Sequence, residues 1–347
     1  MTEFNLPANT LNAEIPPMPF GYTLSRIYRI LRDHSKLFLG LGAPPAVALA
    51  LLYGVMFWVM FASLRPLLTK GVTPSEVAAT QFAMMRIMAP SMLIAMVPIL
   101  AVAAFYLGAA FFAANKIDSG IGTSVRESFG VGWRRLGRSL GLLLWVYFRA
   151  FGLALAVFAV GFGFSFLAAP GGSNQNPSPV LFAIFPLTMM LYFAAYVYGI
   201  IVALRMSLAF AASIEEGLTA REAIARSSRL TQGSKGRIFL LLLVVDLIGV
   251  ACVFFLEIVA GLVFAIGAIV IAAMHLRPTD PLFIVGAVIA GLFVACFFYV
   301  WIALLHGSLV VTLSVVYHDQ RRRKDALLSV SLPATGAQLP PAGAEPA

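Results

Sequence analysis

Five ionisable side chains interrupt long apolar stretches of the chain, and they are the residues best placed to do chemistry. They are Arg149, Arg205, Asp246, Glu257 and His306. A charged side chain at the centre of a bilayer costs about 2.5–3.5 kcal/mol, so each of them needs a partner or water. If the apolar stretches cross a membrane, four of the five reach a similar depth. Asp246 then lies about three helical turns nearer the more basic surface.

These charges are compatible with two roles. Arg149 and Arg205 can balance Asp246 and Glu257, which are eleven residues apart and therefore lie on nearly the same helix face. One hypothesis is a charge-compensated cluster in a cavity, which would act as the substrate or proton site of a transporter. The alternative is structural: ion pairs between helices, with arginines that extend toward lipid phosphates.

The chain carries none of the short motifs that mark common catalytic sites. It has no P-loop, no dinucleotide-binding glycine motif, no zinc-protease motif and no G-x-S-x-G nucleophile motif. Its four histidines (His34, His275, His306 and His318) are scattered over different segments, which argues against a metal site. We therefore expect no cofactor, no metal and no catalytic residue. An intramembrane hydrolase is disfavoured because no nucleophile and base stand at a recognisable spacing.

The composition is that of an integral membrane protein. Of the 347 residues, 61% are hydrophobic and only 11% are charged, whereas about a quarter are charged in soluble domains. Six apolar segments are long enough to span a bilayer. They cover about 37–63, 87–115, 139–168, 180–213, 238–275 and 282–317. The sequence thus predicts an all-α polytopic membrane bundle of six transmembrane helices.

Lysine and arginine predict the orientation of this bundle. Eighteen of the 24 basic residues lie on the side that holds both termini, and four lie on the opposite side. The positive-inside rule then places both termini in the cytoplasm. The net charge of +9 therefore indicates anionic lipid, and not nucleic acid, as the partner. The expected lipid contacts are Arg26, Arg29, Arg32, Arg134, Arg135, Arg138, Arg226, Arg229, Lys235 and Arg237.

A short basic helix is predicted before each pair of apolar segments. Thr219 and Glu222 form a capping-box pattern, and Ser124 with Glu127 repeats it 95 residues earlier. A looser copy at Thr23 opens a basic amphipathic helix over residues 22–36. The chain then divides into three pseudo-repeats between two tails. The predicted boundaries are a tail over 1–20, repeats over about 21–119, 120–216 and 217–320, and a basic stop with a disordered tail over 321–347.

Two details of the third short helix are also predicted. Glu222 stands four residues before Arg226, an orientation that favours a side-chain pair on a helix. Gly233 suits the position just beyond the end of such a helix, where left-handed backbone is common.

The region around this helix resembles a known family. It contains Arg205-x-Ser207-Leu208-Ala209-Phe210, Glu216-Gly217-Leu218, Glu222-Ala223-Ile224, Ser227, Leu230-Thr231 and Gly233. The pattern is similar to the six-span membrane domain attached to some bacterial glycerophosphodiester phosphodiesterases, and to related free-standing inner-membrane proteins. The resemblance implies a bacterial inner-membrane module near lipid metabolism or envelope upkeep. It brings no catalytic residue, because catalysis in the fused proteins belongs to a separate soluble domain.

Two functions remain after these exclusions. The leading expectation is a non-enzymatic inner-membrane protein that binds anionic or lipid-derived molecules, or that scaffolds partners which do so. The alternative is a secondary transporter of a small or lipid-derived substrate that uses the intramembrane polar residues. Prolines within three apolar segments favour the transporter, whereas the lack of an inverted pair of repeats weighs against it.

Overall fold

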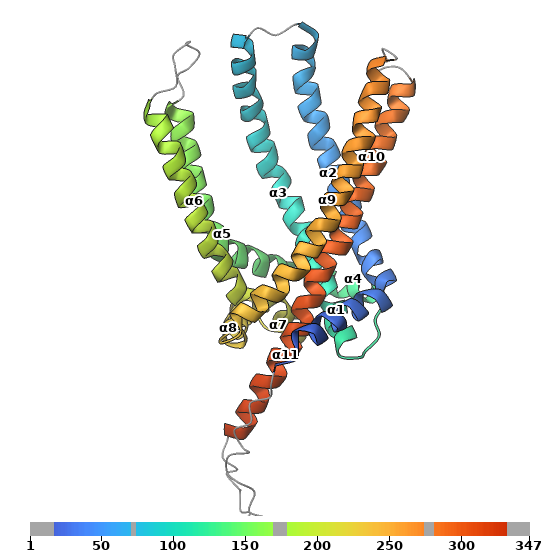
Figure 1. The fold of residues 1–347 in the computed structure, drawn as a ribbon, viewed down its shortest axis with the longest axis vertical. Coiled ribbons are helices and arrows are strands. Elements are labelled where there is room, and N and C mark those ends of the chain that lie inside the picture. Colours follow the sequence, from blue (N-terminus) through green and yellow to red (C-terminus); the bar gives the residue numbers. More distant parts are fainter. Residues whose placement is uncertain (1–16, 71–73, 169–178, 274–280, 332–347) are drawn as a thin grey trace, which may run out of the picture.

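The computed structural model describes residues 17–70, 74–168, 179–273 and 281–331, and every regular element in these ranges is a helix (Figure 1). A π-helix, Ile302–His306, joins the last two α-helices. The α-helices are α1 (Phe20–Asp33), α2 (Ser35–Lys70), α3 (Pro74–Asp118), α4 (Val125–Arg134), α5 (Leu136–Ala168), α6 (Pro179–Met206), α7 (Ala209–Glu215), α8 (Ala220–Leu230), α9 (Lys235–Ala273), α10 (Pro281–Trp301) and α11 (Gly307–Ser331).

Five helical stretches within these ranges are long and apolar enough to cross a membrane, and the fourth runs from α6 into α7. The stretches are Ser35–Leu52, Ile94–Asp118, Leu136–Gly161, Pro186–Glu215 and Lys235–Val259. The sequence of α10, 21 residues long, is also apolar and contains no charged side chain. An all-helical chain with several such helices agrees with the predicted class of multi-pass membrane protein.

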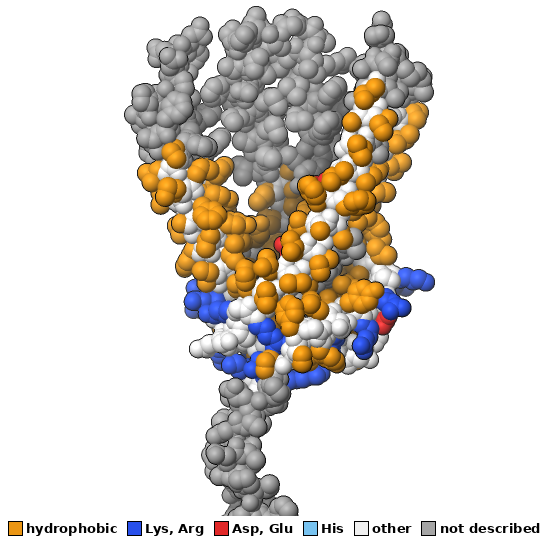
Figure 2. Space-filling view, in the orientation of Figure 1, with side chains coloured by type: hydrophobic (Ala, Val, Ile, Leu, Met, Phe, Trp, Pro, Cys, Tyr) orange, Lys and Arg blue, Asp and Glu red, His pale blue; other side chains and the backbone are white. Residues whose placement is uncertain are grey.

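The long helices diverge in pairs from a common base (Figure 1). The helices paired along the chain are α2 with α3, α5 with α6, and α9 with α10, and α2 also packs against α10. The base consists of α1, α4, α7 and α8 together with the adjoining ends of α3, α9 and α11. In Figure 2 the paired helices present hydrophobic side chains, whereas lysine and arginine gather around the base. Among the described residues, the molecule therefore has a basic base and an apolar part formed by the long helices next to it.

Two of the three predicted helix starts are confirmed. The Glu127 N–H donates to Ser124 Oγ at 3.2 Å, and α4 begins one residue after this serine. The Thr219 N–H donates to the Glu222 carboxylate at 3.0 Å, and α8 begins at the next residue. The third start was wrong, because α1 begins three residues before Thr23, whose hydroxyl bonds back to a carbonyl ahead of the helix.

The apolar segment predicted over 180–213 is interrupted. α6 ends at Met206 and α7 begins at Ala209. In a continuous helix the Leu208 N–H would donate to Leu204, but here it donates to Ser227 Oγ at 3.1 Å. A hydroxyl from α8 thus replaces one backbone acceptor, which turns the chain into the base.

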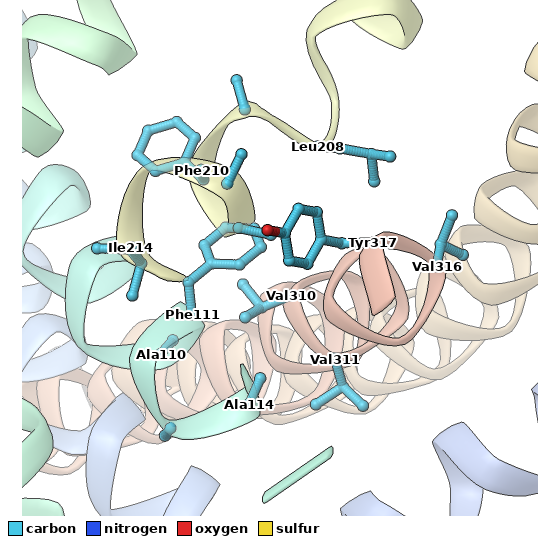
Figure 3. Packing of buried hydrophobic residues seen from close by; sticks show 14 of the residues in the cluster. Ala110, Phe111, Ala114, Leu208, Phe210, Ile214, Val310, Val311, Val316 and Tyr317 are labelled. Carbon is cyan, nitrogen blue, oxygen red and sulfur yellow. The ribbon is translucent and has the colours of Figure 1, made fainter. Parts of the chain in front are cut away.

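α11 is the centre of the base. The predicted last segment ended at 317, but this helix continues to Ser331. From Val310 to Gln320 most of its side chains are buried, and Tyr317 is fully so. Figure 3 shows the side chains of α3 and α7 that surround it. They include Phe111 and Phe210, whose rings stack with centroids 5.6 Å apart.

Small residues allow this close packing. Ala104, Ala109, Ala110, Ala113 and Ala114 of α3 are all almost fully buried. α4 also approaches α3 closely. A Cβ placed on Gly132 of α4 would lie 3.0 Å from the carbonyl oxygen of Phe105 in α3. Side chains this small let helix backbones approach one another, as in other membrane bundles.

Candidate functional site

The five intramembrane ionisable residues do not form the predicted cluster. Arg149, Arg205 and Glu257 are exposed, and neither arginine forms an ion pair with Asp246 or Glu257. The Arg149 guanidinium instead lies over the Trp145 ring, 5.8 Å from its centroid. The two arginines lie on the α5–α6 pair and the two acids on α9, and these pairs diverge above the base (Figure 1).

Asp246 and His306 are the two members that the structure does bring together. His306 ends the π-helix, and this segment packs against α9, the helix that carries Asp246. A Cβ on Gly249, one turn from Asp246, would lie 2.5 Å from Leu305 Cδ1, which shows how closely α9 approaches this segment. His306 Nδ1 is buried without a hydrogen-bond partner among the described residues. π-Helical turns with such polar groups recur at functional sites.

A denser polar site lies in the base, where α1, α3 and α11 meet. The Arg26 Nε donates to Asp118 Oδ1 at 2.7 Å, and its Nη2 donates to the Asp118 carbonyl oxygen at 2.9 Å. His318 Nδ1 lies 2.7 Å from the other carboxylate oxygen. The Asp118 side chain is only 1% exposed, so the guanidinium and the imidazole are what stabilise its buried charge.

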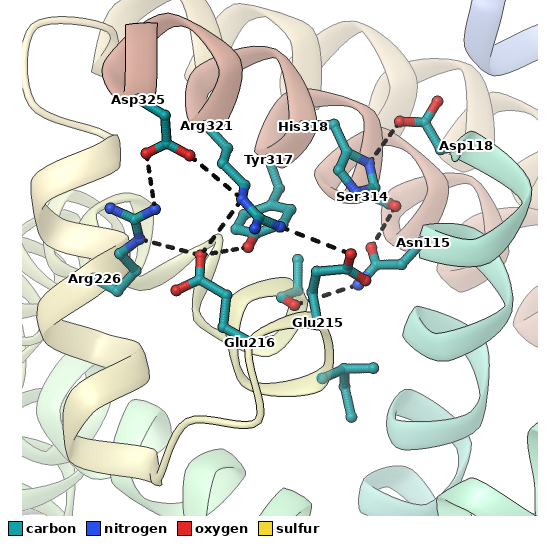
Figure 4. Close-up of polar contacts among 12 residues, drawn as sticks. Asn115, Asp118, Glu215, Glu216, Arg226, Ser314, Tyr317, His318, Arg321 and Asp325 are labelled. Atoms are coloured by element: carbon teal, nitrogen blue, oxygen red, sulfur yellow. Dashed lines mark hydrogen bonds and ion pairs between the residues drawn. The ribbon is translucent and has the colours of Figure 1, made fainter. Parts of the chain in front are cut away.

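One turn away, Asn115 joins three helices. Its Nδ2 donates to the Ala211 carbonyl oxygen of α7 at 3.3 Å, while its Oδ1 accepts from Ser314 of α11 at 2.6 Å (Figure 4). Asn115 and Ser314 are both almost completely buried. Polar bonds of this kind fix the rotation of one helix against another, because an apolar contact would tolerate small slips.

Glu216 organises the opposite side of α11. Its Oε1 accepts from Tyr317 Oη at 2.6 Å and from Arg226 Nε at 3.1 Å. Arg226 also reaches Asp325 at 3.2 Å, and Arg321 lies between the acidic side chains (Figure 4). The predicted pairing of Glu222 with Arg226 was therefore wrong, because tertiary partners outcompete the neighbour on the helix surface.

Further contacts attach the remaining elements. Arg237 pairs with Asp319 at 3.3 Å and also donates to the Met18 carbonyl oxygen, which connects α9, α11 and the segment before α1. Arg135 and Arg138 donate to the carbonyl oxygens of Ile214 and Gly217, at 2.7 and 3.0 Å. These guanidinium groups satisfy carbonyls at the end of α7 that have no partner within the helix.

The ten predicted lipid contacts thus fall into two groups. Arg26, Arg226 and Arg237 are committed to ion pairs inside the base, and Arg135 and Arg138 each donate to a backbone carbonyl of another segment. The other five form no ion pair with a described carboxylate, and all but the half-buried Lys235 are exposed. They are Arg29, Arg32, Arg134, Arg229 and Lys235.

The pKa values at the surface of the base follow from local contacts. Hydrogen bonds from Lys116 and then Thr123 lower the pKa of Glu127. The backbone N–H and then the hydroxyl of Thr219 lower the pKa of Glu222. Burial alone would lower the pKa of Arg226, but its bonds to Glu216 and Asp325 raise it overall. All three groups are therefore held in their charged forms at neutral pH.

Sequence reasoning assigned no structural role to the acidic and amide side chains of the base. Asp118, Glu216, Asp319 and Asn115 follow or end apolar segments, where they resemble ordinary helix-terminal polar residues. One signal was present: the chain has only 15 acidic residues, so acids beside apolar segments should pair with some of the 24 cations. Within the described residues, no group of three or more His, Cys, Asp or Glu side chains is placed to hold a metal ion.

No protein-family model, curated protein or solved structure matches the chain. The assignment of a function therefore depends on the geometry of the base and of the paired helices.

Proposed function

We propose that this chain is a bacterial inner-membrane protein whose cytoplasmic base binds the anionic headgroups of the surrounding lipid. It would serve as a non-enzymatic, lipid-associated accessory or scaffold module of the envelope. In this proposal the molecule has six spans in three pseudo-repeats, and both termini are cytoplasmic. The resemblance to the membrane domain of glycerophosphodiester phosphodiesterases points in the same direction.

The order of the helices supports the repeat. A short helix followed by two long ones occurs as α1–α2–α3, as α4–α5–α6 and as α8–α9–α10. Ser124 and Thr219 precede the second and third short helices in equivalent positions. Pseudo-repeats with an even number of spans keep one orientation, so all three short helices would lie at the same membrane surface.

The observation that carries the lipid proposal is a set of exposed cations around the base. Arg32 on α1, Arg134 on α4 and Arg229 on α8 have no carboxylate partner among the described residues, and each lies on a different short helix. Each lies near the end of its short helix, a few residues before the next long helix begins, and lysine and arginine gather around the base in Figure 2. Each Lys or Arg near an anionic membrane surface contributes about 1 kcal/mol of attraction. Ion pairs inside the base would have cancelled this attraction.

Native mass spectrometry with defined lipids tests the proposal. Purified protein is incubated with equal amounts of a phosphatidylglycerol and a phosphatidylcholine, and the retained lipids are counted. The wild type is expected to retain the anionic lipid preferentially. Replacing Arg32, Arg134 and Arg229 together by Gln should weaken that preference by about fivefold per residue.

The matched control replaces the same three arginines by Lys, which keeps the charge. This variant should retain anionic lipid almost like the wild type, since the attraction comes from charge and not from guanidinium geometry. Equal retention of the two lipids by the wild type, or no change in the Gln variant, would contradict the proposal.

Asp246 and His306 favour a second candidate, a proton-coupled transporter. They are an acid and an imidazole on adjoining helices, and the imidazole has a buried nitrogen without a described partner. The test is proton entry into proteoliposomes driven by a potassium diffusion potential and reported by a trapped pH dye. If the protein is a transporter, the wild type should show a proton flux that Asp246→Asn abolishes. Ser308→Ala serves as the folded control and should keep the flux. A flux equal to that of protein-free vesicles contradicts it.

A further inference from the structure

A small polar pocket opens on the outside of the base, between α1 and the end of α3. It has a volume of about 190 Å³ and is lined by Tyr22, Arg26, Arg29, Ile30, Ile117 and Asp118. The first three belong to one stripe of α1, at successive helical turns. The pocket is separate from the pair formed by Asp246 and His306, and it contains two guanidinium groups.

The donors of this pocket are only partly used inside the protein. Arg26 donates to Asp118 through Nε and through one N–H of Nη2. Both N–H groups of its Nη1 therefore have no described partner. Arg29 is exposed and forms no ion pair within the described residues, not even with Asp33 one turn later. Two fork-shaped donors therefore face one concave surface.

The charge balance of the pocket favours an anion. Asp118 is its single acidic residue, and the carboxylate is almost fully buried and already bonded to Arg26 and His318. Arg29 is left as an uncompensated positive charge at the pocket, and Arg26 still offers donors. Guanidinium groups match the oxygens of phosphate in a bidentate manner, which a point charge such as lysine does not.

We propose that this pocket binds a phosphomonoester group, with Arg29 and the Nη1 group of Arg26 as its donors. Two guanidiniums suit a phosphomonoester because it carries up to two negative charges near neutral pH, whereas a phosphodiester carries one. The phosphate comes either from a lipid headgroup or from free phosphate in solution. The lipid form rests on the function proposed above, because it needs the base at a membrane surface.

Lipid competition in native mass spectrometry tests this pocket. The probes are a diacylglycerol phosphate, a phosphatidylglycerol with the same acyl chains, and inorganic phosphate as a competitor. The wild type should prefer the diacylglycerol phosphate. Arg29→Gln should reduce its binding about tenfold, the loss of a charge-assisted pair of hydrogen bonds, and Arg29→Lys should recover only part of it.

Arg126→Gln is the matched control, because it removes the same charge from an exposed arginine of α4 that lies outside the pocket and outside the three arginines tested above. It should leave the preference for the phosphomonoester unchanged. Displacement of the lipid by millimolar inorganic phosphate in the wild type, but no phosphate effect in Arg29→Gln, would identify free phosphate as a ligand of the same site.

Two results overturn the pocket and remain distinguishable from failure of the proposed function. Equal losses in Arg29→Gln and Arg126→Gln would mean that only the general positive field attracts lipid, so the function survives without the pocket. Equal affinity of the wild type for the phosphomonoester and the phosphodiester lipid has the same meaning. Failure of the proposed function is different, since no anionic lipid would then be preferred over phosphatidylcholine.

Discussion

At the scale of single residues, the base depends on polar side chains that each serve two or three partners. Asn115 bonds to α7 and α11 at once, and Glu216 accepts from Tyr317 and Arg226. A buried donor or acceptor that loses its partner costs about 1–3 kcal/mol, which is more than a satisfied hydrogen bond contributes. Loss of one of these side chains is therefore expected to lower stability measurably.

Asn115→Ala is expected to lower stability by about 1–3 kcal/mol. The change leaves the Ser314 hydroxyl and the Ala211 carbonyl without their described partner, in a region closed to water. Thermal unfolding of the purified protein in detergent measures the effect. The exposed Ser25 provides the control variant, Ser25→Ala. The double variant Asn115→Ala/Ser314→Ala should cost less than the sum of its parts, and strict additivity would argue against the bond.

Glu222 makes the stability of α8 depend on pH. Its pKa is lower in the folded protein than the value of about 4.3 for a free side chain, because Thr219 donates to it. The stability that Glu222 contributes is fully present above its pKa in the unfolded chain, and it is lost as the pH falls through its pKa in the folded protein. Unfolding midpoints of wild type and Glu222→Gln should therefore differ near neutral pH and converge below about pH 4. A constant difference at all pH values would contradict this, and Ser228→Ala serves as the control on the same helix.

Which of these residues the sequence could reveal depends on how far apart the partners are in the chain. Thr219 and Glu222 were predicted because a capping box is local. The partners of Glu216 could not be predicted, because Tyr317 lies 101 residues away and meets it only through the packing of α11. The pairing of Arg149 with Asp246 was a wrong inference from charge balance, since complementary charge says nothing of which helices adjoin.

At the scale of elements, short helices are positioned by close backbone contacts. The local periodicity and caps were sufficient to predict α4 and α8, whereas the break between α6 and α7 was not. That break depends on Ser227, a residue of another helix. Apolar periodicity cannot reveal it, because residues on both sides of the break are equally hydrophobic.

Gly132→Ala should loosen the contact between α3 and α4. The added Cβ would lie 3.0 Å from both the Phe105 carbonyl oxygen and Ala109 Cβ, so one helix has to move. We expect a loss of about 1–3 kcal/mol, as for other overpacked sites. Gly130→Ala is the matched control on the same helix, where a Cβ meets nothing within 4 Å. Its expected effect is a gain of about 0.5–1 kcal/mol, and equal effects of the two changes would refute the close contact.

At the scale of the whole molecule, the described residues divide into a basic base and apolar long helices. The class of the fold followed from composition and from the length of the apolar segments. The central position of α11 did not follow, because the sequence presents it as the end of a span and a basic stop.

Cysteine labelling of intact bacterial cells tests the proposed orientation. Cys252 and Cys296 are both exposed and are first replaced by Ala. A membrane-impermeant maleimide should then label Ser173→Cys, in the segment 169–178 predicted to be external, which lies outside the described residues. It should label Ser25→Cys, on α1, only after the cells are made permeable. The opposite pattern would invert the topology.

The position of α11 in the chain also has a consequence for biosynthesis. Asp118 and His318 are 200 residues apart, and a ribosome adds about 5–20 residues per second, so about 10–40 s separate the synthesis of the two partners. During that interval the earlier helix pairs have left the ribosome, while Asn115 and Asp118 lack the helix that covers them. The nascent protein must therefore pass through a long-lived open form, and a chaperone or insertase that shields this face would decide how much of it matures.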